Sequence, residues 1–339
     1  MCFLACIAIL CLDRSENGMP RKKEKKNENI DKQLANLRRQ ERWRRFKKSK
    51  YLYLMFLPVI LYYLIFCYAP MFGIVIAFKD YNAFKGFAAS PWVGFKQFQS
   101  FFSSPYFWRL LRNTFLISFY GLIFGFPAPI ILALLLNELK DGWFKKITQT
   151  ISYLPHFVSA VIIVGMFVNF LSPSTGLINN IIEMLGGERK YFLNDPKYFR
   201  SLYTILGIWT GVGWGSIIYL AALTNIDPEL YEACIIDGGG RLRQTWHITL
   251  PGIANTIIIM LIMRIGNLLS VGYERIILMY TPATYETADV ISTYVYRRGL
   301  VDADYSFSTA VGLFNSVVGF IFIYAANAVA RRYSETSLW

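Results

Sequence analysis

Residues that commonly carry out chemistry are few in this sequence and lie far apart. The two histidines, His156 and His247, belong to different segments, and neither has cysteines at metal-ligand spacing. None of the five cysteines forms a CxxC pair, so a zinc site or a disulfide framework is not expected. No segment fits GxxxxGK[ST], the pattern of a nucleotide-binding loop. We therefore predict no catalytic residue, no metal site and no cofactor bound by this chain.

One charge interrupts a long apolar stretch. Arg264 is the only charged residue within residues 251–273, and Asn267 follows three positions later, so a helix would place both on one face. If this stretch crosses a membrane, the charge is costly and should face an ionic partner or a wet cavity. Two interpretations stay open: a structural ion pair or snorkelling, and contact with a charged ligand.

The most informative pattern is YEACIIDGGGRLRQTWHITLPGI, residues 231–253. Asp227 and Pro228 predict the start of a helix, because an Asp side chain caps free N–H groups and proline is tolerated in a first turn. Gly238 and the two glycines after it predict the helix end. Pro251 predicts the start of the next helix. These features alone predict a helix–turn–helix, for which a purely structural loop is the simplest interpretation.

Composition indicates what holds these residues in place. Apolar residues make up 55% of the chain and charged residues 17%, against about 25% charged residues in soluble domains. A spanning segment must satisfy its own backbone hydrogen bonds, and about 20 apolar residues are needed for a helix. We predict an all-α integral membrane protein with six transmembrane helices. They lie at 51–68 (within the uncharged 51–78), 113–137, 152–170, between 200 and 227, at 251–273 and at 305–330.

Positive charge predicts the orientation of the spans. Residues 21–50 contain 14 Lys or Arg against four Asp or Glu, directly before the first apolar stretch. This position favours anionic lipid headgroups on the cytoplasmic side over a nucleic-acid partner. We predict a basic cytoplasmic arm at 1–50, a six-helix domain at 51–334, and both termini inside. Residues 1–18 fit either a misassigned start codon or a short membrane-touching extension.

The loop resembles a known family pattern. Glu232-Ala233-Cys234, Gly238 and Ile248-Thr249-Leu250-Pro251 are spaced as in the EAA loop of ABC importer permeases, and Asp237-Gly238 is similar to its carbohydrate branch. Segments such as YLPHFVSAVIIVG (153–165) and ADVISTYVYRRGL (288–300) resemble permeases of the LplB type, which serve oligosaccharides such as aldouronates. Cys234 and the glycines at 239 and 240 depart from the pattern, and the extra glycines would loosen the helix end.

The resemblance implies a mechanism and partners. The loop 224–250 would be a cytoplasmic coupling helix between spans four and five that docks on an ATPase subunit. ATP and Mg would be bound by that ATPase, while this chain does no bond chemistry. The implied partners are a second permease subunit, two ATPase subunits and an extracellular solute-binding lipoprotein or periplasmic binding protein, in a bacterial cell membrane. The implied coupling residues are Glu232, Ala233, Asp237, Gly238, Ile248, Leu250 and Pro251.

The transport path is less defined. Arg264 and Asn267 would contact an anionic sugar such as a uronate, and Trp209 and Tyr219 would stack on sugar rings, although packing alone explains both aromatics. Gly207, Gly211 and Gly215 predict a helix face that another helix approaches closely. The alternatives are a stand-alone secondary transporter or channel, a membrane enzyme and a receptor-like subunit. No Asp or Glu lies in the core of a predicted span, which disfavours ion-coupled transport.

Overall fold

The structure is a computed structural model that describes residue 44 and residues 48–333 of the chain. Helices form its regular structure, and the β pairing found in the described residues is one isolated bridge between Lys79 and Trp92. The all-α prediction is confirmed. The chain divides into two compact units after Val75. Most of the predicted basic arm lies outside the described residues.

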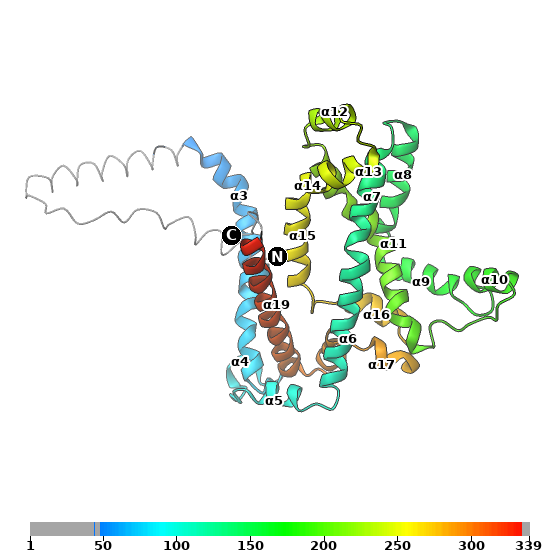
Figure 1. Ribbon diagram of the computed structural model, residues 1–339. Helices are drawn as coiled ribbons and strands as arrows, with labels where there is room; N and C mark the ends of the chain where they lie inside the picture. The colour runs from blue at the N-terminus through cyan, green and yellow to red at the C-terminus, as the bar shows by residue number, and fades with distance from the viewer. Residues whose placement is uncertain (1–43, 45–47, 334–339) are drawn as a thin grey trace, which may run out of the picture. The chain divides into compact units, whose positions relative to one another are not determined.

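The elements follow one another along the chain in this order (Figure 1). They are α3 Lys50–Tyr62, η2 Tyr63–Tyr68, η3 Ala69–Phe78, α4 Gly86–Ala89, α5 Lys96–Phe102, α6 Phe107–Tyr120, η4 Gly121–Gly125, α7 Pro127–Glu138, α8 Trp143–Tyr153, η5 Leu154–Phe157, α9 Ala160–Phe170, α10 Leu177–Met184, α11 Pro196–Leu223, α12 Pro228–Ile236, α13 Arg241–Gln244, η6 Thr245–Thr249, α14 Leu250–Gly252, α15 Ala254–Gly266, α16 Tyr273–Met279, η7 Pro282–Thr284, α17 Tyr285–Ala288, α18 Ile291–Tyr296, η8 Arg297–Val301 and α19 Tyr305–Tyr333.

Four predicted spans are continuous helices that are long and apolar enough to cross a membrane, and two are bent pairs. The continuous ones are Lys50–Phe78, Phe107–Glu138, Pro196–Leu223 and Tyr305–Arg332. The first runs ten residues past its predicted end near Tyr68, as the 3-10 helix η3. The second begins at Phe107 rather than residue 113. Its first turns include Arg109, whose charge has a carboxylate partner within the protein, Asp289.

The third predicted span, 152–170, is wrong as a single helix. The helical run Trp143–Phe157 and helix α9 meet at an angle of 106°. Pro155 lacks an N–H and lies just before the break, where Val158 is extended. The Ser159 side chain then caps α9 by accepting a hydrogen bond from the Ile162 N–H at 3.5 Å. Local cap chemistry therefore overrides an uninterrupted apolar pattern.

The fifth predicted span, 251–273, is also shorter and bent. Pro251 lies in the last turn of the helical run Arg241–Gly252, which meets α15 at 61°. Helix α15 ends at Gly266, so Asn267 is its C-terminal cap rather than part of its interior. Gly266 packs so closely on Ile323 of α19 that a side chain there would collide. The Gly-Asn pair that ends α15 was a stop signal in the sequence.

Helix α11 is the centre of the larger unit. It packs against α6, α7, α8, α15 and α17, and Figure 1 shows α12–α14 at one of its ends and α16–α17 at the other. Of the three glycines expected to allow close approach, Gly215 meets Pro129 of α7, while Gly207 and Gly211 have open space beside them. Among the glycines of α11, the tightest approach is at Gly213. A Cβ atom there would collide with the Ser152 carbonyl and the Tyr153 ring.

We expect Gly213→Ala to destabilise the protein by about 1–3 kcal/mol, because the added methyl group collides with the backbone of α8 and neither helix can move freely. Thermal unfolding of the detergent-solubilised protein measures the effect. Gly207→Ala is the matched control on the same helix, where no atom lies within 4 Å of the new Cβ. Equal melting temperatures for the two variants would contradict the close packing of α8 on α11.

Candidate functional site

The loop 227–253 begins with a well-capped helix. The Asp227 side chain accepts a hydrogen bond from the Glu229 N–H at 3.0 Å, which caps α12. At the other end, Gly238 adopts a left-handed conformation with φ +76°. The Gly238 N–H donates to the Ile235 carbonyl at 3.0 Å and the Gly239 N–H to the Cys234 carbonyl at 2.7 Å. This pair of bonds is a Schellman motif, so the glycines close the helix end rather than loosen it.

Two departures from the family pattern, Cys234 and Gly239, fit together in space. A Cβ at Gly239 would collide with the Cys234 sulfur and carbonyl oxygen. The cysteine side chain therefore occupies the space that an alanine at 239 would need. The larger residue at 234 and the smaller one at 239 fit together at one helix end.

The second half of the loop folds back on the first. Residues 241–252 form a continuous helical run, and the hydroxyls of Tyr231 and Thr249 lie 3.1 Å apart and join it to α12. Arg241 lies 3.6 Å from Glu138 at the end of α7. The loop is thus attached both to itself and to the second span.

The predicted coupling residues occupy different places in this loop. Ile248 and Leu250 are half-buried against the body of the protein, whereas Glu232, Ala233, Asp237, Gly238 and Pro251 are exposed. Large apolar side chains accompany the exposed group: Ile235, Ile236, Leu242 and Trp246, of which Ile236 is 85% exposed. An exposed apolar patch rimmed by polar residues is typical of a protein-binding surface.

A cavity of about 640 Å³ lies between α6, η4, α11 and α15. Its walls include Arg264, Asn267 and Tyr219, which the sequence placed on a transport path. Trp209, the fourth predicted path residue, does not line it. Trp209 instead packs against the buried cluster that includes Ile163, Leu206 and Ile276, which supports the packing interpretation of this residue.

The charge of the cavity is positive. Arg264 and Arg275 line it together with one histidine, and its lining includes no Asp or Glu. A Cβ at Gly121 of η4 would lie only 3.0 Å from an Arg264 guanidinium nitrogen. The lack of a side chain at Gly121 therefore leaves room for the Arg264 guanidinium group. Within the described residues Arg264 forms no ion pair.

Two residues that line the cavity, Arg275 and His156, were not assigned to it from the sequence. Arg275 lies in α16, beyond the end of the fifth apolar stretch, where an arginine signals nothing unusual. His156, which was considered from the sequence only as a metal ligand, stacks on Trp214 of α11 with ring centroids 4.6 Å apart, and both rings line the cavity. No spacing rule connects residues 156 and 214, because they meet only through the packing of η5 on α11.

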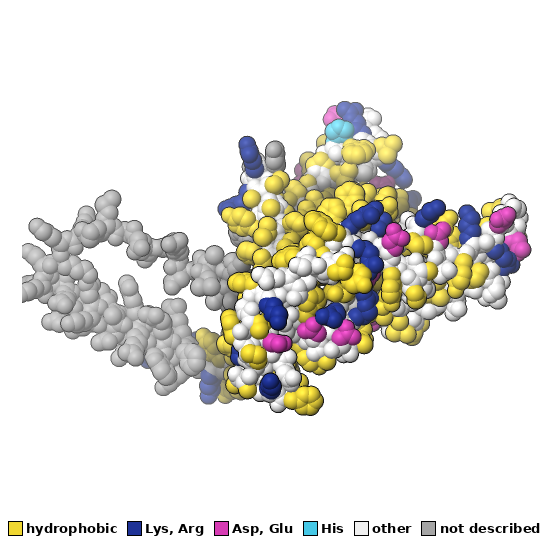
Figure 2. Space-filling view, turned by 90° about the horizontal axis from the view of Figure 1, so that it is seen from below, with side chains coloured by type: hydrophobic (Ala, Val, Ile, Leu, Met, Phe, Trp, Pro, Cys, Tyr) yellow, Lys and Arg dark blue, Asp and Glu magenta, His cyan; other side chains and the backbone are white. Residues whose placement is uncertain are grey.

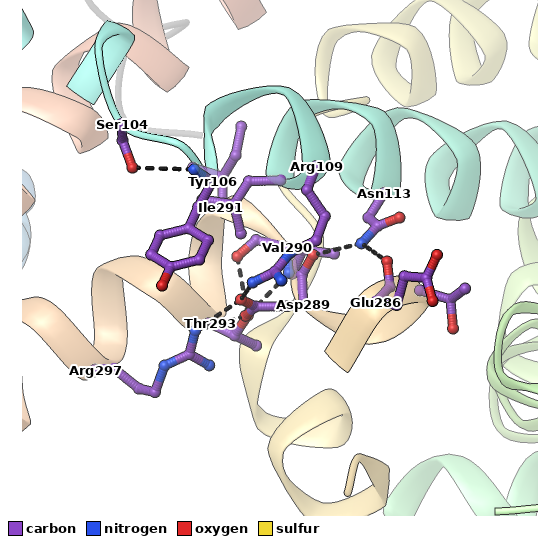
Figure 3. Close-up of polar contacts among 12 residues, drawn as sticks. Ser104, Tyr106, Arg109, Asn113, Glu286, Asp289, Val290, Ile291, Thr293 and Arg297 are labelled. Atoms are coloured by element: carbon purple, nitrogen blue, oxygen red, sulfur yellow. Dashed lines mark hydrogen bonds and ion pairs between the residues drawn. The ribbon is translucent and has the colours of Figure 1, made fainter. Parts of the chain in front are cut away.

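A buried carboxylate joins the second span to the loop between the fifth and sixth (Figure 3). The Asp289 side chain is 0% exposed. It accepts hydrogen bonds from Arg297 at 2.7 and 2.8 Å, from the Thr293 hydroxyl at 2.7 Å and from Arg109 at 3.3 Å. Burial alone would lower the pKa of Arg297, but the hydrogen bonds and charge of Asp289 outweigh it and raise that pKa. Arg297 therefore stays charged at every physiological pH.

Asn113 extends this network to α11. Its amide donates to the carbonyls of Glu286 at 2.8 Å and Asp289 at 3.0 Å, and its oxygen accepts from Arg200 of α11 at 2.9 Å. Figure 2, which views this end of the protein, shows acidic and basic side chains intermixed. The network fixes the ends of α6, α11 and α18 relative to one another.

The fold, the cavity and the exposed loop together describe a membrane permease that works with other subunits. Residues 125–335 match the family of binding-protein-dependent transport system inner membrane components. This match covers more than half of the chain. The chain belongs to this family and is the permease of an ABC transporter that receives its cargo from a binding protein. A stand-alone secondary transporter or channel is thereby excluded.

Two relatives and one solved structure resemble this chain over most of its length. The chain is 50% identical to Protein LplB of Bacillus subtilis (strain 168) over 86% of this chain and 92% of the relative. It is 48% identical to the polygalacturonan/rhamnogalacturonan transport system permease protein YteP of the same organism, over 86% and 91%. Among solved structures, a bacterial alginate ABC transporter in complex with an alginate pentasaccharide-bound periplasmic protein matches with a TM-score of 0.80 and 47% identity, over 87% and 99%.

We expect Asp289→Asn to destabilise the protein by about 3–5 kcal/mol, because two guanidinium groups lose their buried anion. Chemical or thermal unfolding in detergent measures the loss. Asp302→Asn is the control: its carboxylate is half-exposed, lies 3.8 Å from Arg298, and contributes at most about 1 kcal/mol. A loss no larger than that of the control would show that Asp289 does not hold this junction.

Proposed function

We propose that this permease forms the membrane path for an acidic oligosaccharide, such as one containing uronate units. The observation that carries the proposal is the pair of arginines, Arg264 and Arg275, in a cavity lined by no Asp or Glu. A cation in such a site is costly unless a ligand or water satisfies it, and guanidinium groups bind carboxylates by two parallel hydrogen bonds. Relatives named for polygalacturonan and alginate transport support this cargo.

The remaining cavity wall suits a carbohydrate. The stacked rings of His156 and Trp214 present a flat surface, and Tyr219, Asn267 and Ser270 add side chains that can exchange hydrogen bonds with sugar hydroxyls. The combination of flat rings, a few polar groups and charge follows the usual design of ligand sites.

We further propose that the loop 227–253 docks on a separate ATPase subunit, which binds ATP and Mg and carries out the hydrolysis. Exposed Glu232, Ala233 and Gly238 provide the contact, together with the apolar side chains beside them. Ile248, Leu250 and Pro251 join the loop to α15, so a push on α12 reaches the cavity wall as a rigid-body movement. The complete transporter then contains two ATPase subunits, a second permease subunit and the binding protein.

The proposed orientation follows from charge. In this proposal the basic residues before the first span, and Arg331 and Arg332 in the last turn of α19, belong on the cytoplasmic side. This places the loop 227–253 in the cytoplasm and the segments around α10 and α16–α18 outside. In this arrangement the cavity lies between a cytoplasmic docking surface and an outer, charged rim.

We expect Arg264→Gln to reduce kcat/KM for uptake of trigalacturonate by roughly ten- to hundred-fold, the value of one charge-assisted hydrogen bond pair. Uptake of the neutral analogue galactotriose should change little. The complete transporter, reconstituted in liposomes with its binding protein, provides the measurement.

Arg112→Gln is the matched control, since Arg112 is an exposed arginine of α6 that does not line the cavity. An equal loss for both sugars in Arg264→Gln, or an equal loss in the control, would reject charge recognition at this site.

We expect Gly238→Ala to weaken co-purification of the permease with its ATPase while membrane insertion stays intact. The left-handed φ of +76° costs alanine about 1 kcal/mol, so the helix end and the docking surface shift. Glu232→Ala should weaken the same contact without altering the backbone.

Gly186→Ala is the control, because Gly186 also has a left-handed φ, +81°, with open space around it, but lies after α10. It should suffer the same local strain and keep its ATPase. If Gly238→Ala and Glu232→Ala both retain the ATPase and transport normally, the docking proposal is wrong.

A further inference from the structure

A second cavity, of about 420 Å³, lies at the outer rim of the permease. Its walls come from the start of α6 and from the segment α17–η8 between the last two spans. They include three tyrosines and three arginines, Tyr106, Tyr285, Tyr294, Arg109, Arg297 and Arg298, together with Asp289, Val301 and Asp302. None of these residues belongs to the central cavity.

The aromatic rings hold the arginines in place. The Arg109 guanidinium lies 4.9 Å from the centre of the Tyr106 ring, and that of Arg297 lies 5.3 Å from the Tyr285 ring. Tyr285 in turn stacks on Tyr280. Hydrogen bonding to Tyr280, helped by burial, raises the pKa of Tyr285, which keeps its hydroxyl neutral. The wall is therefore a rigid surface of flat rings and planar cations.

Two donors in this wall are unused. Among the described residues, the buried nitrogens Arg109 Nε and Arg298 Nε have no hydrogen-bond partner. Buried donors are satisfied in most native proteins, and an exception calls for an explanation such as a ligand. The unpaired N–H groups of Arg109 and Arg298 lie just behind the cavity wall, so an occupant rich in acceptor oxygens could satisfy them after a small side-chain movement.

The charge balance argues for hydroxyls over a strong anion. Asp289 is fully paired with Arg109 and Arg297, and Arg298 lies 3.8 Å from Asp302 and 3.1 Å from Asp304. The arginine charges are thus largely compensated, unlike those of the central cavity. Mixed Arg and Asp groups beside tyrosine rings can donate to and accept from sugar hydroxyls, while the rings cover the sugar's apolar face.

The site lies in line with the central cavity. Along one face of α6, Arg109 lines the outer cavity, Asn113 forms the buried network, and Ile117 lines the central cavity. These positions are four residues apart, so the two cavities lie about 12 Å from each other along the helix.

We infer that the outer cavity is a saccharide-binding subsite that holds a pyranose unit of the cargo, acidic or neutral, before it reaches the central cavity. The inference rests on the proposal that the cargo is an oligosaccharide. It adds a division of roles: the outer site recognises sugar rings and hydroxyls, and the central site recognises the carboxylate.

A cysteine-protection experiment tests this inference. Val301 lines the outer cavity and is 68% exposed, so Val301→Cys, with the five native cysteines replaced by serine, reports access to it. The two permease and two ATPase subunits are purified together in detergent, without the binding protein and without ATP, and the rate of maleimide labelling is measured. Trigalacturonate and galactotriose should each slow labelling several-fold.

Added variants assign the protection to this cavity. Tyr106→Ala should abolish it, because the ring that covers the sugar is lost, whereas Trp108→Ala should keep it. Trp108 is a neighbouring exposed aromatic residue that does not line the cavity. Arg264→Gln in the central cavity should also keep it. Unchanged thermal unfolding of Tyr106→Ala verifies that its fold is intact.

Three results would overturn the inference. The first is that neither sugar slows labelling. The second is that trigalacturonate and citrate slow labelling but galactotriose does not, which would indicate an anion site. The third is that only the purified binding protein slows labelling, which would indicate a protein-docking surface. Labelling in detergent requires neither turnover nor a particular orientation. If the transporter prefers neutral sugars in uptake, the proposal of an acidic cargo is refuted. The labelling result would still test the outer subsite, because it does not depend on the charge of the sugar.

Discussion

The buried carboxylate of Asp289 is the interaction that holds together the start of α6, the start of α11 and the segment α17–η8. A charge without exposed surface is tolerable only when it is paired and hydrogen-bonded, and Asp289 meets that condition through Arg109, Thr293 and Arg297. Its partners come from the second span and from the segment between the fifth and sixth. The network therefore positions the start of α6, which lines the cavity beside Asp289, and the later turns of the same helix line the central cavity.

The two cavities differ in how their positive charge is balanced. In the cavity between the start of α6 and the segment α17–η8, arginines face aspartates and stack on tyrosines, so their field is short-ranged. In the central cavity, Arg264 and Arg275 have no such anions among the lining residues. In the proposed function, this unbalanced charge stabilises an anionic cargo. If both proposals hold, the same residue type serves ring and hydroxyl recognition in one cavity and carboxylate recognition in the other.

The loop 227–253 shows how helix-end chemistry can produce a rigid surface from few residues. A side-chain cap at Asp227, a left-handed Gly238 and the tight fit of Cys234 against Gly239 fix α12 without a hydrophobic core beneath it. Rigidity matters because a docking element transmits motion only if it does not deform. The exposed apolar side chains on it are then available to a partner rather than to internal packing.

The sequence by itself determined the helical class, the approximate places of the spans and the helix–turn–helix with its caps, because these depend on local composition, periodicity and cap residues. It also singled out Arg264, since a lone charge in an apolar stretch is conspicuous. Tertiary structure decided the rest. The pairing of Arg109 with Asp289, the stacking of His156 on Trp214 and the inclusion of Arg275 in the cavity depend on contacts between residues distant in the chain. No local pattern encodes which distant residues will meet, because packing of whole helices sets those distances.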